Sequence, residues 1–289
     1  VQSGKPEETA VSVQAGSYYP WVNENGIWYF KDPDGTIVKG AWREYDKNRY
    51  YLNNDGKMAV GWKKLDGAWY YFQSWGGVYR DAFYTVKNVP YYSDADGKMA
   101  TGWKLIDDVY YYFDDQGAMY RNRFFEYDKN TYYVDADGKM ASGFEQIDGI
   151  WYYFRSWGGM YTGIHTIGGT KYAFQSWGGL YHDQTFTIGG KTYYANSDGT
   201  FATGWVQNGG KTYYFDEDGT SHTGWLLLDG THYWINANGT RRDDELFQYD
   251  GNYYYVDKNG VMATSGWVYW DYNYYYPRSW GGMYKNAFI

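Results

Sequence analysis

One unit of 20 or 21 residues repeats along almost the whole chain, and this repeat constrains the fold more than any other feature of the sequence. Each unit holds two short β-prone runs around a turn dipeptide, as in the segment GWKKLDGAWYYF at 61–72. An Asp-Gly pair between such runs is typical of a two-residue type I′ hairpin turn. The repeat therefore predicts a series of β-hairpins, and no segment shows the 3.6-residue period of a helix.

The turn at 66–67 also predicts the register of its hairpin. It places Trp62 opposite Tyr71. We call the place of Trp62 the GW position of the repeat and the place of Tyr71 the column position. Side chains alternate between the two faces of a strand. Trp62, Trp69 and Tyr71 should therefore share one face, while Tyr70 should lie on the other.

The same frame fits about 13 units along the chain. A lone two-stranded hairpin is marginal in water, so each unit must pack on its neighbours. We therefore predict an all-β solenoid of stacked hairpins over residues 17–289, with 1–16 as a linker or N-terminal tail. Methionines seven residues after the column should fill the seams between units, since methionine adapts to irregular gaps. The column positions are Phe30, Tyr51, Tyr71, Tyr92, Tyr112, Tyr133, Tyr153, Ala173, Tyr194, Tyr214, Trp234, Tyr255 and Tyr276.

Composition excludes several classes of function. The chain contains no Cys, which rules out disulfides and Cys-based metal sites. Its net charge of -8 argues against nucleic acid as a partner and permits cationic ligands. No apolar run approaches the ~20 residues of a membrane helix, so membrane insertion is not expected.

Catalysis and metal binding also find little support in the sequence. The four His are scattered over units that offer no repeated Ser or Asp partner. A glycosidase is the enzyme alternative, but it needs two carboxylates at a fixed separation in one cleft. The DADG turns at 94–97 and 135–138 are similar to calcium loops, yet their Gly comes too early and the bidentate Glu is missing. We therefore predict no catalytic residues, metal or cofactor.

Three segments carry a resemblance to a known family: MAVGWKKLDGAWYYF at 58–72, MATGWKLIDDVYYYF at 99–113 and MASGFEQIDGIWYYF at 140–154. They resemble the choline-binding repeats of Gram-positive surface proteins and phage lysins, which are related to glucan-binding and clostridial-toxin repeats. NAFI at 286–289 resembles a variant of the GW segment. The resemblance implies a left-handed superhelix of hairpins without catalysis, in which choline sits between consecutive hairpins among GW, WYY and next-hairpin aromatics, with a Met nearby.

Carried over to this chain, the resemblance gives a set of candidate ligand-binding rings. Aromatic faces suit a quaternary ammonium, which makes no directional hydrogen bonds. The same rings would also serve as core alone, because a Tyr-rich solenoid needs stacked rings to cohere. The candidates are Trp21, Trp28, Phe30, Trp42, Tyr51, Trp62, Trp69, Tyr71, Tyr92, Trp103, Tyr110, Tyr112, Phe144, Trp151, Tyr153, Trp205, Tyr214, Trp225, Trp234, Trp267, Tyr274 and Tyr276.

The preferred ligand is choline on teichoic acid, bound by an attachment module of a larger exported protein. We expect that protein to be secreted and to lie at the surface or wall of a Gram-positive bacterium, or to be a released phage lysin. Segments such as IGGKTYYANSDG look closer to the glucan or toxin branch. An α-glucan or another surface or host glycan therefore remains the alternative ligand.

Two local departures from the repeat carry expectations of their own. The frame holds Ile164 and Lys171 in one unit and Thr185 and Thr192 in the next, so we predict no ligand between about 164 and 194. In four units a SWGG sequence puts a tryptophan where the others keep a polar turn residue. That ring either packs on the neighbouring hairpin, which the Tyr following it favours, or widens the ligand platform. The four are Trp75, Trp157, Trp177 and Trp280.

Overall fold

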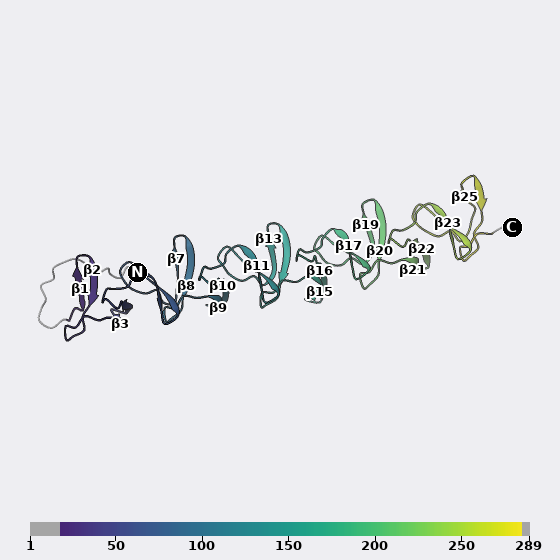
Figure 1. Ribbon diagram of the computed structural model, residues 1–289. Coiled ribbons are helices and arrows are strands. Elements are labelled where there is room, and N and C mark those ends of the chain that lie inside the picture. Colours follow the sequence, from purple (N-terminus) through teal and green to yellow (C-terminus); the bar gives the residue numbers. More distant parts are fainter. Residues whose placement is uncertain (1–17, 285–289) are drawn as a thin grey trace. The chain divides into compact units, whose positions relative to one another are not determined.

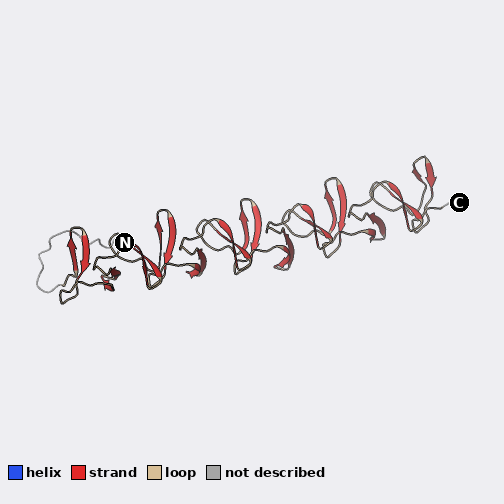
Figure 2. Ribbon diagram, viewed as in Figure 1, coloured by secondary structure: helices blue, strands red, loops and turns tan. Residues whose placement is uncertain are grey.

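The computed structural model describes residues 18–284, and every regular element among them is a β-strand. The strands form thirteen antiparallel hairpins, each a two-stranded sheet of its own. Figure 2 shows these hairpins as pairs of strands separated by loops. The predicted all-β repeat is confirmed. The expected tail at 1–16 and the NAFI segment lie outside the described residues.

The chain divides between Ala141 and Ser142 into two compact units, and each is a stack of hairpins in chain order (Figure 1). The first unit holds β1–β2 (Trp21–Glu24, Ile27–Phe30), β3–β4 (Ala41–Tyr45, Asn48–Leu52), β5–β6 (Gly61–Leu65, Ala68–Phe72), β7–β8 (Ala82–Val86, Val89–Ser93), β9–β10 (Gly102–Ile106, Val109–Phe113) and β11–β12 (Arg123–Tyr127, Asn130–Val134). The second holds β13–β14 (Gly143–Ile147, Ile150–Phe154), β15–β16 (Gly163–Ile167, Thr170–Phe174), β17–β18 (Gln184–Ile188, Lys191–Ala195), β19–β20 (Gly204–Asn208, Lys211–Phe215), β21–β22 (Gly224–Leu228, Thr231–Ile235), β23–β24 (Glu245–Tyr249, Asn252–Val256) and β25–β26 (Val268–Trp270, Asn273–Tyr275).

The predicted register is confirmed in the β5–β6 hairpin, where Trp62 pairs with Tyr71. Both turn residues have positive φ, 48° at Asp66 and 83° at Gly67, as a type I′ turn requires. The same pairing of GW and column positions holds in the first twelve hairpins. In the last hairpin the strands end one pair earlier, at Val268 and Tyr275.

One face of each hairpin supplies the core of its unit. The residue after the column position points inward, and it is 1% exposed at Phe72 and 0% exposed at Phe113. Burying a phenyl ring contributes about 1.5–3 kcal/mol, so a row of such residues is a major source of stability.

The loops connect one hairpin to the next through backbone hydrogen bonds. The amide of Met58 donates to the carbonyl of Trp28, and the amide of Met99 donates to that of Trp69, both at 2.8 Å. Met58 follows the second hairpin and contacts the first, and Met99 follows the fourth hairpin and contacts the third. The seam position expected for methionine is therefore confirmed at these two sites.

The DADG turns use their first carboxylate to hold their own backbone. The Asp94 Oδ1 accepts hydrogen bonds from the amides of Asp96 at 3.0 Å and Lys98 at 2.8 Å, and Asp135 repeats the arrangement. Between residues 18 and 284, no group of three or more His, Cys, Asp or Glu is placed to hold a metal ion. The same part of the chain has no helix that is long and apolar enough to cross a membrane.

Because these carboxylates are satisfied by backbone amides, a chelator should leave the protein unchanged. We expect the melting temperature in EDTA to equal that in buffer, measured by circular dichroism. A fall of many degrees that added Ca²⁺ reverses would contradict this assignment of the turns.

Candidate functional site: aromatic cages between consecutive hairpins

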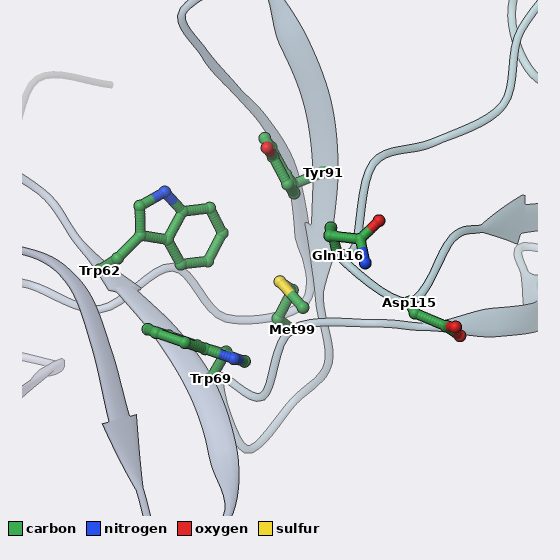
Figure 3. A pocket seen from close by; sticks show the side chains of 6 residues that line it. All are labelled: Trp62, Trp69, Tyr91, Met99, Asp115 and Gln116. Atoms are coloured by element: carbon green, nitrogen blue, oxygen red, sulfur yellow. The ribbon is translucent and has the colours of Figure 1, made fainter.

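A pocket of about 440 Å³ lies between the third and fourth hairpins. Trp62 on β5 and Trp69 on β6 form one side, and Tyr91 on β8 faces them (Figure 3). Met99 lies between these rings, in the loop that follows β8. The loop after the fifth hairpin closes the set with Asp115 and Gln116. We call this arrangement cage 3, after the hairpin that supplies its first two rings.

The rings of cage 3 meet at steep angles, so they enclose a space rather than stack on one another. The Trp62 ring lies 6.3 Å from Trp69 at 89° and 5.0 Å from Tyr91 at 67°, measured between ring centroids. Trp69 remains 42% exposed, which leaves one wall open to solvent. Asp115 adds a carboxylate at the edge. The cage thus combines ring faces, a polarisable sulfur and a negative charge, which together favour a cation.

The predicted third ring, Tyr71, does not line this pocket. It lies behind Trp62, at 4.9 Å, and stacks on Tyr84 at 5.5 Å. The other column residues proposed as ligand contacts stand in the same place behind a GW ring, 4.8–5.2 Å from it. These are Phe30, Tyr51, Tyr92, Tyr112, Tyr153, Tyr214, Trp234 and Tyr276.

Some column residues also have a clear structural role. Phe30 and Tyr92 are buried. The Tyr92 hydroxyl donates to Asp81 Oδ1 at 2.5 Å, and the Tyr255 hydroxyl donates to Asp244 Oδ1 at 2.6 Å. Burial and the Asp81 carboxylate raise the pKa of Tyr92 to about 12. In these two hairpins, the hydroxyl holds the start of the hairpin against its second strand.

The ring that faces the tryptophans comes from the position before the column in the next hairpin, which we call the pre-column position. Alternation within a hairpin placed Tyr70, which holds this position, on the face opposite the GW ring of its own hairpin, and Tyr70 is buried at 7% exposure. Tyr occupies it in every unit, from Tyr29 to Tyr275, and that invariance within the chain was the available sign of its importance. Its contact with the preceding GW ring recurs at 4.7–5.2 Å, as in Trp21–Tyr50 and Phe144–Tyr172.

Four further cages repeat these positions, cages 1 and 5 within the first compact unit and cages 7 and 11 within the second. Cage 1 has Trp21, Trp28, Tyr50 and Met58; cage 5 has Trp103, Tyr110, Tyr132 and Met140; cage 7 has Phe144, Trp151, Tyr172 and Leu180; cage 11 has Trp225, His232, Tyr254 and Met262. In each cage, the backbone amide of the last residue named donates a hydrogen bond to the backbone carbonyl of the residue that carries the second ring, as Met99 does to Trp69 in cage 3.

The SWGG loops keep the ordinary turn geometry. Gly76 has a φ of 93° and its amide donates to the Gln73 carbonyl at 2.8 Å, just as Gly97 donates to Asp94 in a DADG turn. The second glycine has another function. A Cβ on Gly77 would lie 2.0 Å from the Trp75 ring, so the indole lies flat across a residue without a side chain.

The SWGG tryptophans add a wall to particular cages. Trp75 lies 6.0 Å from Tyr50 of cage 1, and Trp280 lies 6.1 Å from Tyr254 of cage 11. Both occupy the loop position that Gln116 holds in cage 3. The tyrosine that follows each loop contacts another ring: Tyr79 stacks on Tyr84 at 4.4 Å, and Tyr284 lies tilted, 6.5 Å from Tyr276. Each of these two rings therefore packs on a neighbouring hairpin and widens a cage at the same time.

The comparisons with known proteins agree with this geometry. A model described as choline-binding repeat matches residues 100–143, 182–221 and 202–242. A model described as putative cell wall binding repeat matches 21–37, 40–58, 60–77, 142–160 and 244–262. The chain belongs to the choline-binding repeat family. No curated protein matches the sequence.

Solved structures show the same fold. CbpJ from Streptococcus pneumoniae is 27% identical, with a TM-score of 0.61, and the match covers 84% of this chain and 99% of CbpJ. Choline binding protein F from the same species, solved in the presence of a peptidoglycan analogue, is 26% identical over 84% of this chain and 98% of its own, with a TM-score of 0.58. The modular autolysin LytC of that species shares the fold at 22% identity and a TM-score of 0.51, over 78% of this chain and 52% of LytC.

Not every choline-binding repeat of this chain forms an open cage. The repeats with Ile164 and Thr185 at the GW position have no ring there, and Ala173 is fully buried. No cage therefore starts between 164 and 194, but Tyr172 and Leu180 from this stretch complete cage 7, so the predicted empty stretch is too wide at its first end. In the last hairpin, Trp267 and Tyr274 are 64% and 70% exposed, and no later hairpin among residues 18–284 brings a third ring to them. The remaining candidates, Trp42 and Trp205, lie against arginine side chains of the protein itself.

Proposed function

We propose that this protein is a non-catalytic attachment module that binds choline of a cell-wall polymer through cages 1, 3, 5, 7 and 11. The observation that carries the proposal is cage 3, where Trp62, Trp69 and Tyr91 surround a hollow with Met99 beside it. A trimethylammonium group presents a positive surface without hydrogen-bond donors. It therefore gains most from ring faces, at about 0.5–2 kcal/mol for each contact.

Several weak cages on one chain suit a polymer that repeats its ligand. Once one cage is filled, the next choline of the same polymer binds intramolecularly, which can raise the avidity by 10²–10⁴-fold. The net charge of -8 also favours cationic groups. We propose choline-bearing teichoic acid of a Gram-positive wall as this polymer. The module would then hold a larger exported protein at the cell surface.

An α-glucan is the second candidate, because exposed rings also stack on sugars. The steep angles in cage 3 favour a compact cation over a flat sugar, which needs one broad face. Retention on a choline-type resin, compared with retention on dextran, tests the choice. We expect retention only on the choline resin and elution by free choline. Retention on dextran alone would show that the ligand is a glucan.

Salt offers a separate test of what holds the cation. Because rings rather than ion pairs surround it, choline affinity should change little between low and high ionic strength. Isothermal titration in the two buffers measures this. Loss of most of the affinity at high salt would show that carboxylates such as Asp115 dominate.

The variant Trp69→Ala should weaken choline binding in one cage without unfolding the protein. Trp69 is 42% exposed, so its ring supports little of the core. Losing one ring contact worth about 0.5–2 kcal/mol weakens that site by roughly 2- to 30-fold. In isothermal titration, the number of tight sites should fall by one.

The matched control is Tyr272→Ala, since Tyr272 is 89% exposed in the last turn and belongs to no cage. Its titration should equal that of the wild type. Both variants should keep the wild-type circular dichroism spectrum. A Trp69→Ala protein that binds choline like the wild type would exclude cage 3 as a site.

A further inference from the structure

Cage 2, formed by the second and third hairpins, contains a cation from the protein itself. Arg49 occupies the position that Trp28 and Trp69 hold in cages 1 and 3, two residues before the column. Its backbone is placed in the same way, because its carbonyl accepts a hydrogen bond from the amide of Val78 at 3.0 Å. The two rings of the cage are present, since Trp42 lies 5.0 Å from Tyr70.

The Arg49 side chain crosses the space that is hollow in cage 3. Its guanidinium carbon lies 4.2 Å from the centroid of the Trp42 ring, at cation–π distance. Its Nη1 donates to the carbonyl of Asp96 at 3.0 Å, 47 residues along the chain. Asp96 lies four residues after the column position of its hairpin. Gln116 holds the equivalent position and forms the far wall of cage 3. The guanidinium thus spans cage 2 from one wall to the other, and Nε also faces Glu44 at 3.6 Å.

Cage 10, formed by the tenth and eleventh hairpins, also contains a guanidinium group, which comes from a different position of the repeat. Arg241 stands where cages 1, 3, 5 and 11 keep methionine, and its guanidinium carbon lies 5.3 Å from the Trp205 ring. Gly260 leaves room for the stem, because a Cβ there would lie 2.6 Å from Arg241 Cδ. The second ring is present as well, with Tyr233 5.0 Å from Trp205. The side chain is only 16% exposed, and Nε donates to Asp243 Oδ1 at 2.6 Å.

Lysine makes a related contact in the eighth repeat. Lys171 is at the same position as Arg49, and its Nζ donates to the carbonyl of Asp218 at 3.1 Å, also 47 residues away. There the GW position is Ile164, so the repeat has no GW ring for a ligand. A basic residue at this position therefore reaches the far wall in both repeats, with or without a ring beside it.

From these contacts we infer that cages 2 and 10 are filled by internal ligands, the guanidinium groups of Arg49 and Arg241, and are closed to choline. This inference rests on the proposed function for the meaning of an open cage. A tethered cation has an effective concentration on the order of millimolar, so a free cation must displace it at each encounter. The arginines therefore set how many repeats bind ligand and leave cages 1 and 3, on either side of cage 2, as separate sites.

Replacing Arg49 should open a binding site. In Arg49→Ala the hollow is emptied, and in Arg49→Trp the ring found in cages 1 and 3 is restored beside Trp42 and Tyr70. We expect isothermal titration of the full chain with choline to give one more site than the wild type for Arg49→Trp, and a weaker added site for Arg49→Ala. The control is Arg43→Ala, which removes the same charge from the same hairpin, where Arg43 pairs with Asp32 at 2.7 Å. Its number of sites should not change.

A second measurement follows the Arg49 side chain itself, first without ligand and then with choline. In the free wild-type protein, nuclear magnetic resonance should show the Arg49 side-chain protons shifted upfield by the Trp42 ring, and saturating choline should leave them in place. A wild type that binds no choline would remove the proposed function but not this shift. The inference itself is overturned if the Arg49 resonances lack the shift, if choline moves them, or if folded Arg49→Trp has the wild-type number of sites.

Discussion

Phe113→Ala is expected to lower the free energy of unfolding by about 3–5 kcal/mol. Phe113 is 0% exposed, and it packs with Tyr92 and Ala100 in the core of the first unit. Alanine would leave a cavity between two hairpins that depend on each other, because in a stack each repeat is stabilised by its nearest neighbours. Urea unfolding followed by circular dichroism measures the loss.

The control for this variant lies in the same hairpin. Leu105 on β9 is 56% exposed, so Leu105→Ala should change the free energy of unfolding by no more than about 0.5 kcal/mol. The two side chains differ in burial, not in the hairpin that carries them. Equal losses for both variants would show that the inward face of the hairpin has been assigned wrongly.

The second large effect is expected at Gly117, whose alanine variant should lose about 2–5 kcal/mol of stability. Its φ of 81° costs an L-residue about 1–2 kcal/mol. In addition, the new Cβ would lie 2.3 Å from the sulfur of Met99, and overpacking of this kind costs about 1–3 kcal/mol. Since Met99 lines cage 3, the variant should also bind choline more weakly there.

Gly67→Ala separates the two contributions. Gly67 has nearly the same φ, 83°, but nothing lies within 4 Å of a Cβ built on it. It should therefore show the backbone cost alone and keep wild-type choline binding. Thermal melts and choline titrations of both variants give the comparison. If the two proteins melt at the same temperature, the packing of Met99 against the loop contributes nothing to stability.

The hairpins and their register could be predicted from the sequence because the necessary information is local. The turn at 66–67, the strands beside it and the alternation of side chains all lie within twelve residues. One consistent turn fixes which residues pair, and the repeat then carries the same register to the other units. The seam methionines follow from the same frame, since Met58 and Met99 hold equivalent places.

The cage rings were predicted only in part. Trp62 and Trp69 follow from the alternation within one hairpin, and both line the pocket. Tyr71 shares their face by the same argument, but it backs Trp62 because the next hairpin covers it with Tyr84. Alternation gives the face of a side chain, and only packing between hairpins decides whether that face is covered.

What the sequence by itself determined is therefore the hairpin, its register and the family of the repeat. Only the tertiary structure decided which rings face one another, that Trp280 adds a wall to a cage two hairpins earlier, and that Arg49 reaches into cage 2. The physical reason is distance along the chain. A hairpin is closed by neighbours in sequence, whereas a cage wall such as Asp96 lies 47 residues from the arginine that contacts it, and its place depends on how successive hairpins stack.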